Sequence, residues 1–392
     1  MRDGAPARAT GGRVLFLATE DWYFAGHRLG LARAALDAGY DVSVATRVRA
    51  HARVIGDAGV RLLTLEWARR SLNPLRLFHE AQAIRDFVDS EKPSIIHCVS
   101  LRTIVAACLG LRRLPRQRAV FAFTGLGYLF VGRAVWKRLA RRAIGRLIGD
   151  AAGRHDVVLL FENDDDRARI VSLAGRADIA AETNPGSGVD MQRFAILPAT
   201  GNDAPVFAFA GRMLRIKGVG ELIAASRELT ARGVAHEVVL AGGIDPDNRS
   251  GIGESELVAM MSGAPVRWLG PVDDIRSVWV RADVCVAPSH GGEGVPLSLV
   301  EAAACGRALI ASDVAGCRDV VIDGETGVLV APGDAAALAD AMQRFAGDEA
   351  ERVAMGRRAA ALVREKFSRE TVNARTLALY RRMLGGNAGG SA

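Results

Sequence analysis

Residues 288–334 read PSHGGEGVPLSLVEAAACGRALIASDVAGCRDVVIDGETGVLVAPGD, and this stretch decides the fold of the second half of the chain. It continues the short apolar run ADVCVAPS, which predicts a buried strand, into a cluster of glycines at Gly291, Gly292 and Gly294. A helical pattern begins at or just after Pro296, where the missing N–H of proline costs nothing. A strand, a glycine loop and a helix start in this order predict an anion site, because unpaired backbone N–H groups and the positive end of the helix dipole converge there.

Two glutamates frame this loop. Glu293 lies inside it, and Glu301 follows more than two helical turns later, where it can line a cleft behind the loop. The pattern suits a nucleotide sugar: the loop amides face the diphosphate, one carboxylate accepts both ribose hydroxyls, and the other binds hydroxyls of the sugar.

Glu293-x7-Glu301, with Gly294, Pro296, Leu297 and the following GRALIASDVAG and GETGVLV, resembles the donor site of family 4 retaining glycosyltransferases of GT-B fold. A bare E-x7-E would be weak, since a solvated helix often carries two glutamates at this spacing. The resemblance implies that Glu293 orients the sugar and Glu301 holds the ribose. The implied donor-binding set is Gly211, Gly291, Gly292, Gly294, Val295, Pro296, Leu297 and Glu301.

Size and composition favour two domains. The chain has 392 residues, 49% of them hydrophobic and 24% charged, an ordinary globular composition. No apolar run reaches the roughly 18 to 20 residues of a membrane span. We expect residues 1–12 to be a disordered leader without the apolar core of a signal peptide. The five cysteines form no CxxC pair, which favours buried thiols in a reducing cytoplasm over a zinc site.

Strand and helix patterns alternate along the chain, which predicts parallel sheets covered on both faces. The alternation starts with RVLFLAT at residues 13–19 and lapses at residues 194–205, FAILPATGNDAP, which we interpret as an interdomain linker. The predicted fold is α/β: two doubly wound, Rossmann-like domains facing a cleft, the first at residues 13–195 and the second at residues 196–367. By the resemblance alone, a helix at residues 368–385 returns to the first domain.

Two cations follow the first strand of the second domain. Arg212 ends VFAFAGR and Lys217 precedes a helix, so both side chains lie beyond the carboxyl end of a strand, where ligands bind in parallel sheets. There they would neutralise a diphosphate leaving group, and G-R-x4-K-G resembles the family's phosphate motif. A pair of surface cations is the alternative. Asp245-x-Asp247 has the spacing of a metal-binding motif, but its place in a proline-containing segment favours a turn, and we expect no metal cofactor.

The first domain resembles a bacterial subgroup that extends polyprenyl-diphosphate-linked saccharides for capsule, O-antigen or other surface glycans. The resemblance rests on DWYFAGHRLGLA, SIIHCVSLRT, FAFTGLGYLF, LLFENDDDR and NPGSGVDMQRF, and with the second domain it runs from about Arg13 to Tyr380. The candidate acceptor-side residues are Asp21, Trp22, His27, His97, Thr124, Gly125 and Gly127.

Each acceptor-side candidate has a structural alternative. Asp21 could bind an acceptor hydroxyl, and His27 an acceptor or phosphate, although His27 could also be an ordinary polar residue early in a helix. Residues 124–127 could approach a ligand or form a plain tight turn, and residues 186–190 could touch the donor or act as a hinge. Relatives carry H-x-H where this chain has His97-Cys98-Val99, so the role of the second histidine is not transferred, and His97 itself could be a core residue.

The net charge of +7 is concentrated in the first domain, where no acidic residue occurs between Glu91 and Asp150. One-sided charge of this kind indicates an anionic partner. The helix VGRAVWKRLARRAIGRLIG suits an anionic membrane surface better than nucleic acid, with a solvated helix face as the alternative. Its expected contact residues are Arg133, Trp136, Lys137, Arg138, Arg141 and Arg142.

The sequence therefore predicts a retaining glycosyltransferase at the inner face of the cell membrane. It would move a sugar from a nucleotide diphosphate sugar, expected to be UDP-linked, to a hydroxyl of a lipid-linked saccharide, without metal. Arg212, Lys217 and Glu293 are the expected catalytic residues. Two rival interpretations are a sugar-nucleotide epimerase of similar architecture and a non-catalytic nucleotide-sugar-binding subunit at the membrane.

Overall fold

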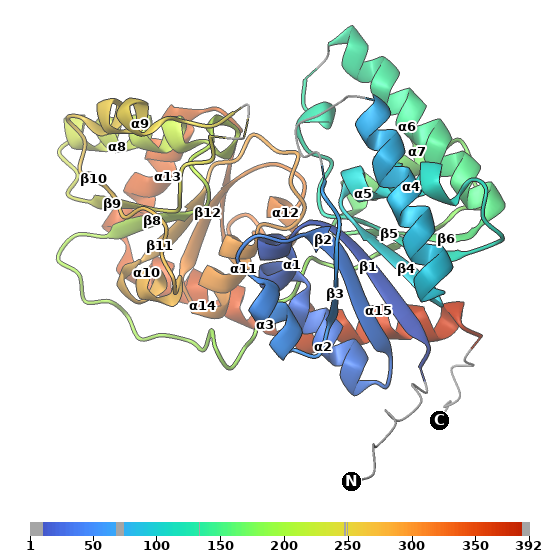
Figure 1. The fold of residues 1–392 in the computed structure, drawn as a ribbon. Helices are drawn as coiled ribbons and strands as arrows, with labels where there is room; N and C mark the ends of the chain where they lie inside the picture. Colours follow the sequence, from blue (N-terminus) through green and yellow to red (C-terminus); the bar gives the residue numbers. More distant parts are fainter. Residues whose placement is uncertain (1–10, 68–73, 133, 247, 249, 386–392) are drawn as a thin grey trace. The chain divides into compact units, whose positions relative to one another are not determined.

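A computed structural model describes residues 11–67, 74–132, 134–246, 248 and 250–385. The chain divides into two compact units, one formed by residues 1–187 and 372–392 and the other by residues 188–371 (Figure 1). Each unit contains one parallel sheet, as the alternating pattern predicted.

The first unit holds a seven-stranded sheet in the order β3-β2-β1-β4-β5-β6-β7. Alternate side chains of its apolar central strands feed two separate cores, one on each face, so neither face can be left uncovered. The strands are β1 Arg13–Glu20, β2 Asp41–Arg47, β3 Arg61–Thr64, β4 Ile95–Val99, β5 Arg118–Phe123, β6 Asp156–Phe161 and β7 Ala180–Thr183.

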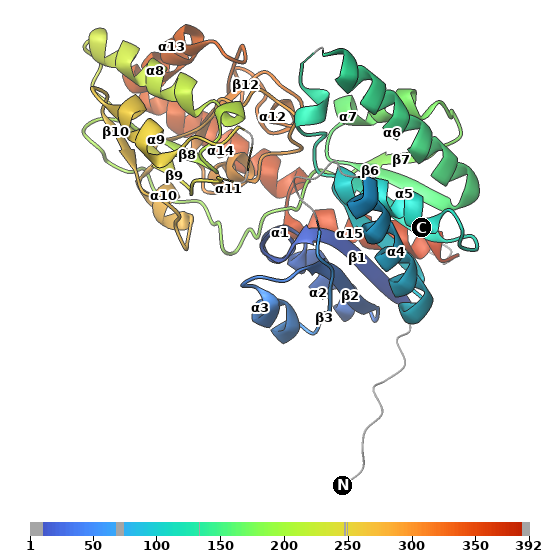
Figure 2. The same ribbon diagram turned by 45° about the horizontal axis from the view of Figure 1, so that its top comes forward.

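Helices cover both faces of this sheet (Figures 1 and 2). One core is closed by α4 Pro74–Glu91, α5 Leu101–Leu111, α6 Val135–Arg154 and α7 Asp164–Ala174. The other is closed by α1 Asp21–His27, α2 Leu29–Asp37, α3 Ala52–Asp57 and α15 Arg369–Met383. A 3₁₀ turn, η1, spans Tyr128–Phe130. Because α15 contributes Leu377, Leu379 and Tyr380 to this second core, the predicted return of the C-terminal helix is confirmed.

The second unit holds a six-stranded sheet in the order β10-β9-β8-β11-β12-β13. Its strands are β8 Val206–Ala210, β9 Glu237–Ala241, β10 Val266–Trp268, β11 Val284–Ala287, β12 Ala308–Ser312 and β13 Gly327–Val330. One face is covered by α8 Val219–Ala231, α9 Glu254–Met261 and α13 Ala335–Gly347. The other is covered by α10 Arg276–Arg281, α11 Leu297–Ala304, α12 Cys317–Val320 and α14 Glu349–Lys366. The five cysteines are buried with free thiols, as predicted.

The division of the chain differs from the predicted boundaries. The first unit ends at Ser187 rather than at residue 195, and the second runs to Thr371. The supposed linker is held against the second unit: the backbone N–H of Leu197 donates to the Cys305 carbonyl at 3.0 Å, and the guanidinium of Arg307 donates to the Pro198 carbonyl at 2.9 Å. These two contacts tie the loop to the second unit, while Pro198, Gly201 and Asn202 remain exposed.

The expected leader falls mostly outside the described residues, which begin at Gly11. Its last two residues are held against the sheet. The N–H of Gly11 donates to the Gly39 carbonyl at 3.0 Å, and the Gly12 carbonyl accepts from Asp41 at 2.9 Å. The disordered segment that the sequence predicted therefore does not extend to residue 12.

Candidate active site

In the second unit, β8 and β11 are neighbouring parallel strands, so the loops after them meet at the carboxyl edge of the sheet. The first loop carries Arg212 and leads into the 3₁₀ turn η2, Arg215–Lys217. The second is the glycine loop that ends at Pro296, the residue before α11. The helix therefore starts where the sequence predicted.

Backbone contacts fix Lys217 beside the glycine loop. Gly218, directly after it, has a φ of +74°, and a Cβ there would collide with the carbonyl oxygen of Pro288, so only glycine fits. The backbone N–H of His290 also donates to the Ile216 carbonyl at 2.9 Å. These contacts join the two loops by their main chains.

The side chains of Lys217 and Glu293 form an ion pair at this junction, with Lys217 Nζ on Glu293 Oε1. Each side chain is about a quarter exposed, at 23% and 24%, so the pair is open to solvent on one side. The predicted phosphate-binding cation and the predicted sugar-binding carboxylate are thus in direct contact.

The glycine loop turns through left-handed backbone conformations, with φ of +97° at Gly291 and +81° at Gly292. On its far side, a Cβ at Gly316 would meet the Gly294 carbonyl oxygen, so the loop after β12 approaches as closely as backbone can. The loop is held from two directions, and the first turn of α11 directly follows it.

Glu301 lies in the middle of α11, and the charged groups that act on it differ from the Lys217 partner of Glu293. Burial raises its pKa to about 8, with Asp274 adding to the rise, while the guanidinium groups of Arg193 and Arg369 oppose it. Sequence reasoning missed Arg193 and Arg369, because the first lies near the unit boundary and the second at the start of the returning helix.

Arg212 is also partnered in a way that the sequence did not indicate. Its Nη1 donates to Asp245 Oδ2 at 2.6 Å. Asp245 lies in a turn after β9, where its carbonyl accepts from the N–H of Asn248 at 3.0 Å. The other aspartate of the motif, Asp247, lies outside the described residues. Within the described part of the chain, no group of three or more His, Cys, Asp and Glu side chains is placed to hold a metal ion.

In the first unit, Asp21 has a structural role, which corrects the acceptor contact that the sequence suggested. Its carboxylate is fully buried and accepts backbone N–H bonds from Trp22 at 2.8 Å, Arg49 at 2.7 Å and His51 at 2.9 Å. Burial alone would raise its pKa, but these three bonds outweigh it and lower the pKa below the ordinary value. Asp21 thus ties the start of α1 to the loop after β2.

His27 and Trp22 are accessible at the ends of the same short helix. Trp22 is exposed, and His27 is stacked on Tyr23 with ring centroids 4.4 Å apart. His27 Nδ1 also lies 3.4 Å from Ser187 Oγ. Thr124, at the end of β5, is hydrogen bonded to Tyr23 of α1, so the loop after β5 begins beside this helix. Gly125 and Gly127 follow with φ of +99° and +66°.

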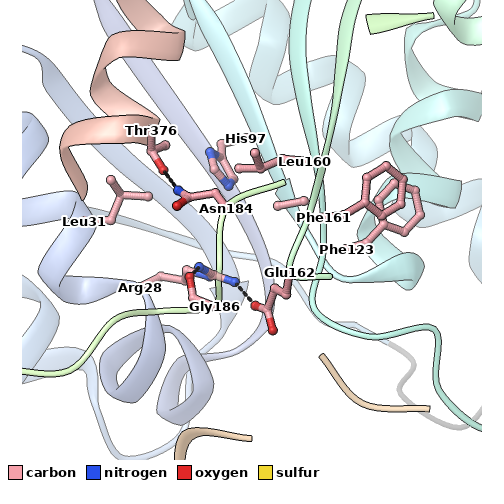
Figure 3. Close-up of a pocket in the computed structure, with 11 residues that line it drawn as sticks. Arg28, Leu31, His97, Phe123, Leu160, Phe161, Glu162, Asn184, Gly186 and Thr376 are labelled. Atoms are coloured by element: carbon pink, nitrogen blue, oxygen red, sulfur yellow. Dashed lines mark hydrogen bonds and ion pairs between the residues drawn. The ribbon is translucent and has the colours of Figure 1, made fainter. Parts of the chain in front are cut away.

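His97 is a core residue, as the structural alternative proposed. It is buried with its Nδ1 2.6 Å from the Tyr380 hydroxyl, which joins β4 to α15. Burial, followed by the charge of Arg28, lowers its pKa to about 3. Figure 3 shows His97 lining a small cavity with the Arg28–Glu162 ion pair. The cavity holds about 10 Å³, room for about one water molecule and far too little for a saccharide.

The basic helix α6 is divided between two roles. Lys137 is buried and donates to the Val131 carbonyl at 2.8 Å. Arg141 donates to the carbonyls of Leu129 and Gly132, both at 2.8 Å. Both side chains hold the loop before the helix, so Lys137 is not exposed as the predicted membrane contact requires, and Arg141 is only partly exposed. Arg133 lies outside the described residues.

The exposed surface of α6 keeps both apolar and cationic side chains. Its first turns present Val135, Trp136 and Leu139 to solvent, together with Arg138 and Arg142. The helix carries this mixed face from its first residues.

Family models match both units. Residues 204–348 match the family described as glycosyl transferases group 1, and residues 13–144 match the family described as glycosyl transferase 4-like. The first match contains Arg212, Lys217, Glu293 and Glu301, and the second contains the whole segment from β1 into α6.

Two curated relatives illustrate the similarity. The capsular polysaccharide biosynthesis glycosyltransferase CapM of Staphylococcus aureus is 30% identical over 44% of this chain and 44% of its own. The N,N'-diacetylbacillosaminyl-diphospho-undecaprenol alpha-1,3-N-acetylgalactosaminyltransferase of Campylobacter jejuni is 24% identical over 91% of this chain and 95% of its own. The chain spans about half the length of the first curated relatives it matches.

Solved structures show the same fold over nearly the whole chain. Sucrose-phosphate synthase from Thermosynechococcus elongatus matches with a TM-score of 0.78 at 23% identity, over 96% of this chain and 100% of its own. Anabaena HepE, solved with UDP and glucose, matches with a TM-score of 0.74 at 16% identity, over 95% and 100%. With both units matched in order, the chain belongs to the group 1 and 4-like glycosyltransferases of GT-B fold.

Proposed function

We propose that the protein transfers a sugar, with retention of anomeric configuration, from a nucleotide diphosphate sugar to a hydroxyl of a lipid-linked saccharide. The observation that carries this proposal is the Lys217–Glu293 ion pair beside the glycine loop and the start of α11. A cation, a carboxylate and the start of a helix at one sheet edge suit a donor with an anionic diphosphate and a polyhydroxylated sugar.

Catalysis would be positional and electrostatic. As the bond between the anomeric carbon and the phosphate oxygen breaks, negative charge grows on the diphosphate, and Lys217 and Arg212 stabilise it. Glu293 exchanges its contact with Lys217 for hydroxyls of the sugar. The acceptor oxygen bonds to the same face of the anomeric carbon and passes its proton to the departing phosphate oxygen, so the step needs no carboxylate nucleophile.

The nucleoside half of the donor would lie toward Glu301. The carboxyl group of Glu301 can accept hydrogen bonds from the ribose hydroxyls, and Arg193 and Arg369 favour its ionised form against the rise of its pKa to about 8. A UDP-linked donor is supported by the likeness in fold to HepE, which was solved with UDP and glucose. No metal is required in this scheme, because Arg212 and Lys217 supply the positive charge.

A lipid-linked acceptor is supported by the Campylobacter relative, whose name specifies a diphospho-undecaprenol-linked substrate. The carboxyl edge of the first sheet carries the first turns of both α4 and α6, since each helix follows a strand that ends there. Leu75 and Phe78 on α4 are exposed, like Val135, Trp136 and Leu139 on α6. Arginines among these apolar side chains suit an anionic bilayer surface.

We therefore propose a peripheral enzyme at the inner face of the cell membrane, with acceptor contacts from Trp22 and His27. None of the helices in the described residues combines the length and apolar character that a bilayer span requires.

The test is incubation of the purified protein with radiolabelled UDP- and GDP-sugars, each with and without membrane lipid extract. The proposal predicts label in the lipid fraction from a UDP-sugar, with the donor's anomeric configuration kept in the product. Conversion of the donor without lipid would identify an epimerase, and binding without any turnover would identify a non-catalytic subunit. A trapped covalent glycosyl-enzyme would refute the direct displacement.

A further inference from the structure

Arg212 and Asp245 form an ion pair in which the two partners differ in exposure. The Asp245 side chain is 9% exposed and the Arg212 side chain 39%, and the Nη1–Oδ2 distance is 2.6 Å. The carboxylate is therefore the fixed inner partner, and the guanidinium is the outer one. An arginine carries five N–H donors in a planar fork, so this bond leaves others for a ligand.

The backbone around the pair is held tightly. Beyond the ends of β8 and β9, the N–H of Gly211 donates to the Ala241 carbonyl at 2.8 Å, and the N–H of Met213 donates to the Gly243 carbonyl at 3.0 Å. A Cβ at Gly242 would collide with the Gly211 carbonyl oxygen, so the two segments touch through main chain alone. Arg212 and Asp245 are thus presented by two segments that cannot shift independently.

Ser250 and Ile252, which follow Asp245 in the loop after β9, also bond to the segment after β8. The N–H of Ile252 donates to the Met213 carbonyl at 3.0 Å, and the N–H of Arg215 donates to the Ser250 carbonyl at 2.7 Å. An aspartate buried in so restrained a loop has little freedom to follow a moving arginine. The arginine has to adopt the orientation that Asp245 sets.

We propose that Asp245 is a positioning residue that orients the Arg212 guanidinium toward the diphosphate of the donor. This inference rests on the proposed function, since it assigns Arg212 to the donor phosphates. A long, flexible side chain loses rotamer freedom when it grips a ligand, and fixing it beforehand reduces that cost. Asp245 would supply this preorganisation without touching the substrate.

Asp245 also carries a negative charge near an anionic ligand, so its two effects oppose each other. The accepted hydrogen bond favours diphosphate binding by aligning Arg212, and the charge disfavours it by offsetting Arg212. Asparagine keeps an accepting oxygen and removes the charge, whereas alanine removes both. The two substitutions therefore separate orientation from charge.

The experiment measures the Kd of UDP and of uridine by calorimetry for the full chain and its variants. Asp245→Ala should weaken UDP binding about tenfold, the effect of losing a charge-assisted hydrogen bond, and leave uridine binding unchanged. Asp245→Asn should bind UDP within about threefold of the unsubstituted protein. Glu256→Gln is the matched control, because Glu256 pairs with Arg215 at 2.5 Å near the same loop but both side chains are largely exposed.

In an Arg212→Ala background, Asp245→Ala should cause no further loss of UDP affinity, because the residue acts only through Arg212. Asp245→Ser provides the same test if the alanine variant does not fold. Equal weakening of UDP and uridine, or unchanged UDP binding by a folded Asp245→Ala protein, would overturn the positioning role while leaving the proposed function intact. An unsubstituted protein that binds UDP no better than uridine would overturn both.

Discussion

Lys217 and Glu293 follow different strands of one sheet and yet form an ion pair, because Gly218 lets the Pro288 backbone approach the turn that carries Lys217. The pair brings together the cation and the carboxylate that the proposed reaction needs at opposite ends of the scissile bond. In the ion pair the two charges neutralise each other. A donor that binds here would break this pair and would contact Lys217 through its diphosphate and Glu293 through its sugar.

Lys217→Met tests the role of the cation. It keeps the length of the side chain and removes the charge that would stabilise the leaving diphosphate, so kcat should fall by about 100- to 1,000-fold, with a smaller change in KM for the donor. Steady-state kinetics checks this, with Lys366→Met on the exposed end of α14 as control. An unchanged kcat would remove Lys217 from the mechanism.

Gly218→Ala tests the junction between the two loops. The new Cβ would meet the Pro288 carbonyl oxygen at a φ of +74°, so either the turn or the glycine loop must move. Gly233 is a matched control, because it has the same φ but no atom within 4 Å of an added Cβ. Gly233→Ala should cost about 1 kcal/mol of strain alone, whereas Gly218→Ala should cost more than about 2 kcal/mol and also weaken UDP binding. Thermal unfolding and calorimetry measure the two effects.

Glu301 should make stability depend on pH in the alkaline direction. Its pKa is raised to about 8 by burial, from an ordinary 4.5, so the folded state retains a proton that the unfolded chain loses. The free energy of unfolding therefore falls as pH rises from about 4.5 to about 8, by up to about 1.4 kcal/mol per pH unit. Glu301→Gln cannot ionise, and its melting temperature relative to the unsubstituted protein should rise between pH 5 and pH 9. A constant difference would contradict the raised pKa of Glu301.

His97 should lower the stability of the protein as the pH falls, whereas Glu301 lowers it as the pH rises. Its pKa is lowered to about 3 by burial and by Arg28, so between about pH 6.5 and pH 3 the unfolded chain binds a proton that the folded state excludes. Stability contributed by neutral His97 is present above pH 6.5 and is lost on acidification, at about 1.4 kcal/mol per pH unit. His97→Gln should therefore flatten the acid side of the stability profile. His79→Gln, on the exposed face of α4, should leave that profile unchanged.

The membrane contact is tested by Trp136→Ser combined with Leu139→Ser. These exposed side chains would enter the bilayer interface, so the double variant should bind vesicles containing anionic lipid at least about tenfold more weakly. Val258→Ser with Val280→Ser removes two exposed apolar side chains of the second unit as control. Co-sedimentation with anionic and neutral vesicles measures both. Equal binding by the two double variants would contradict an α6 contact.

The sequence predicted the two parallel sheets and the meeting of Lys217 and Glu293, because both depend on local patterns. Apolar strands followed by glycine loops place Lys217 and Glu293 at the same sheet edge whatever the surrounding loops do. The edge strands β7 and β13 were not identified, and in β7 the apolar run is interrupted by Glu182 and Thr183.

Errors occurred where a side chain's partner is far away in sequence. Asp21 looked available to a ligand, but its acceptors are satisfied by backbone N–H groups of the loop after β2. Lys137 and Arg141 looked like surface cations, but the preceding loop presents carbonyls to them. Asp245 was correctly assigned to a turn, but its pairing with Arg212 was missed, because Arg212 follows a different strand. Side-chain direction is set by tertiary packing that no local pattern records.

The proposed reaction requires a nucleotide diphosphate to bind at the carboxyl edge of the second sheet. A crystal structure of the protein with UDP tests it most directly. We expect diphosphate oxygens on Lys217, Arg212 and the backbone N–H groups at the start of α11, with the Lys217–Glu293 pair opened and the ribose on Glu301. UDP bound away from these residues, or bound beside them with Lys217 still paired to Glu293 and no contact to the phosphates, would contradict it.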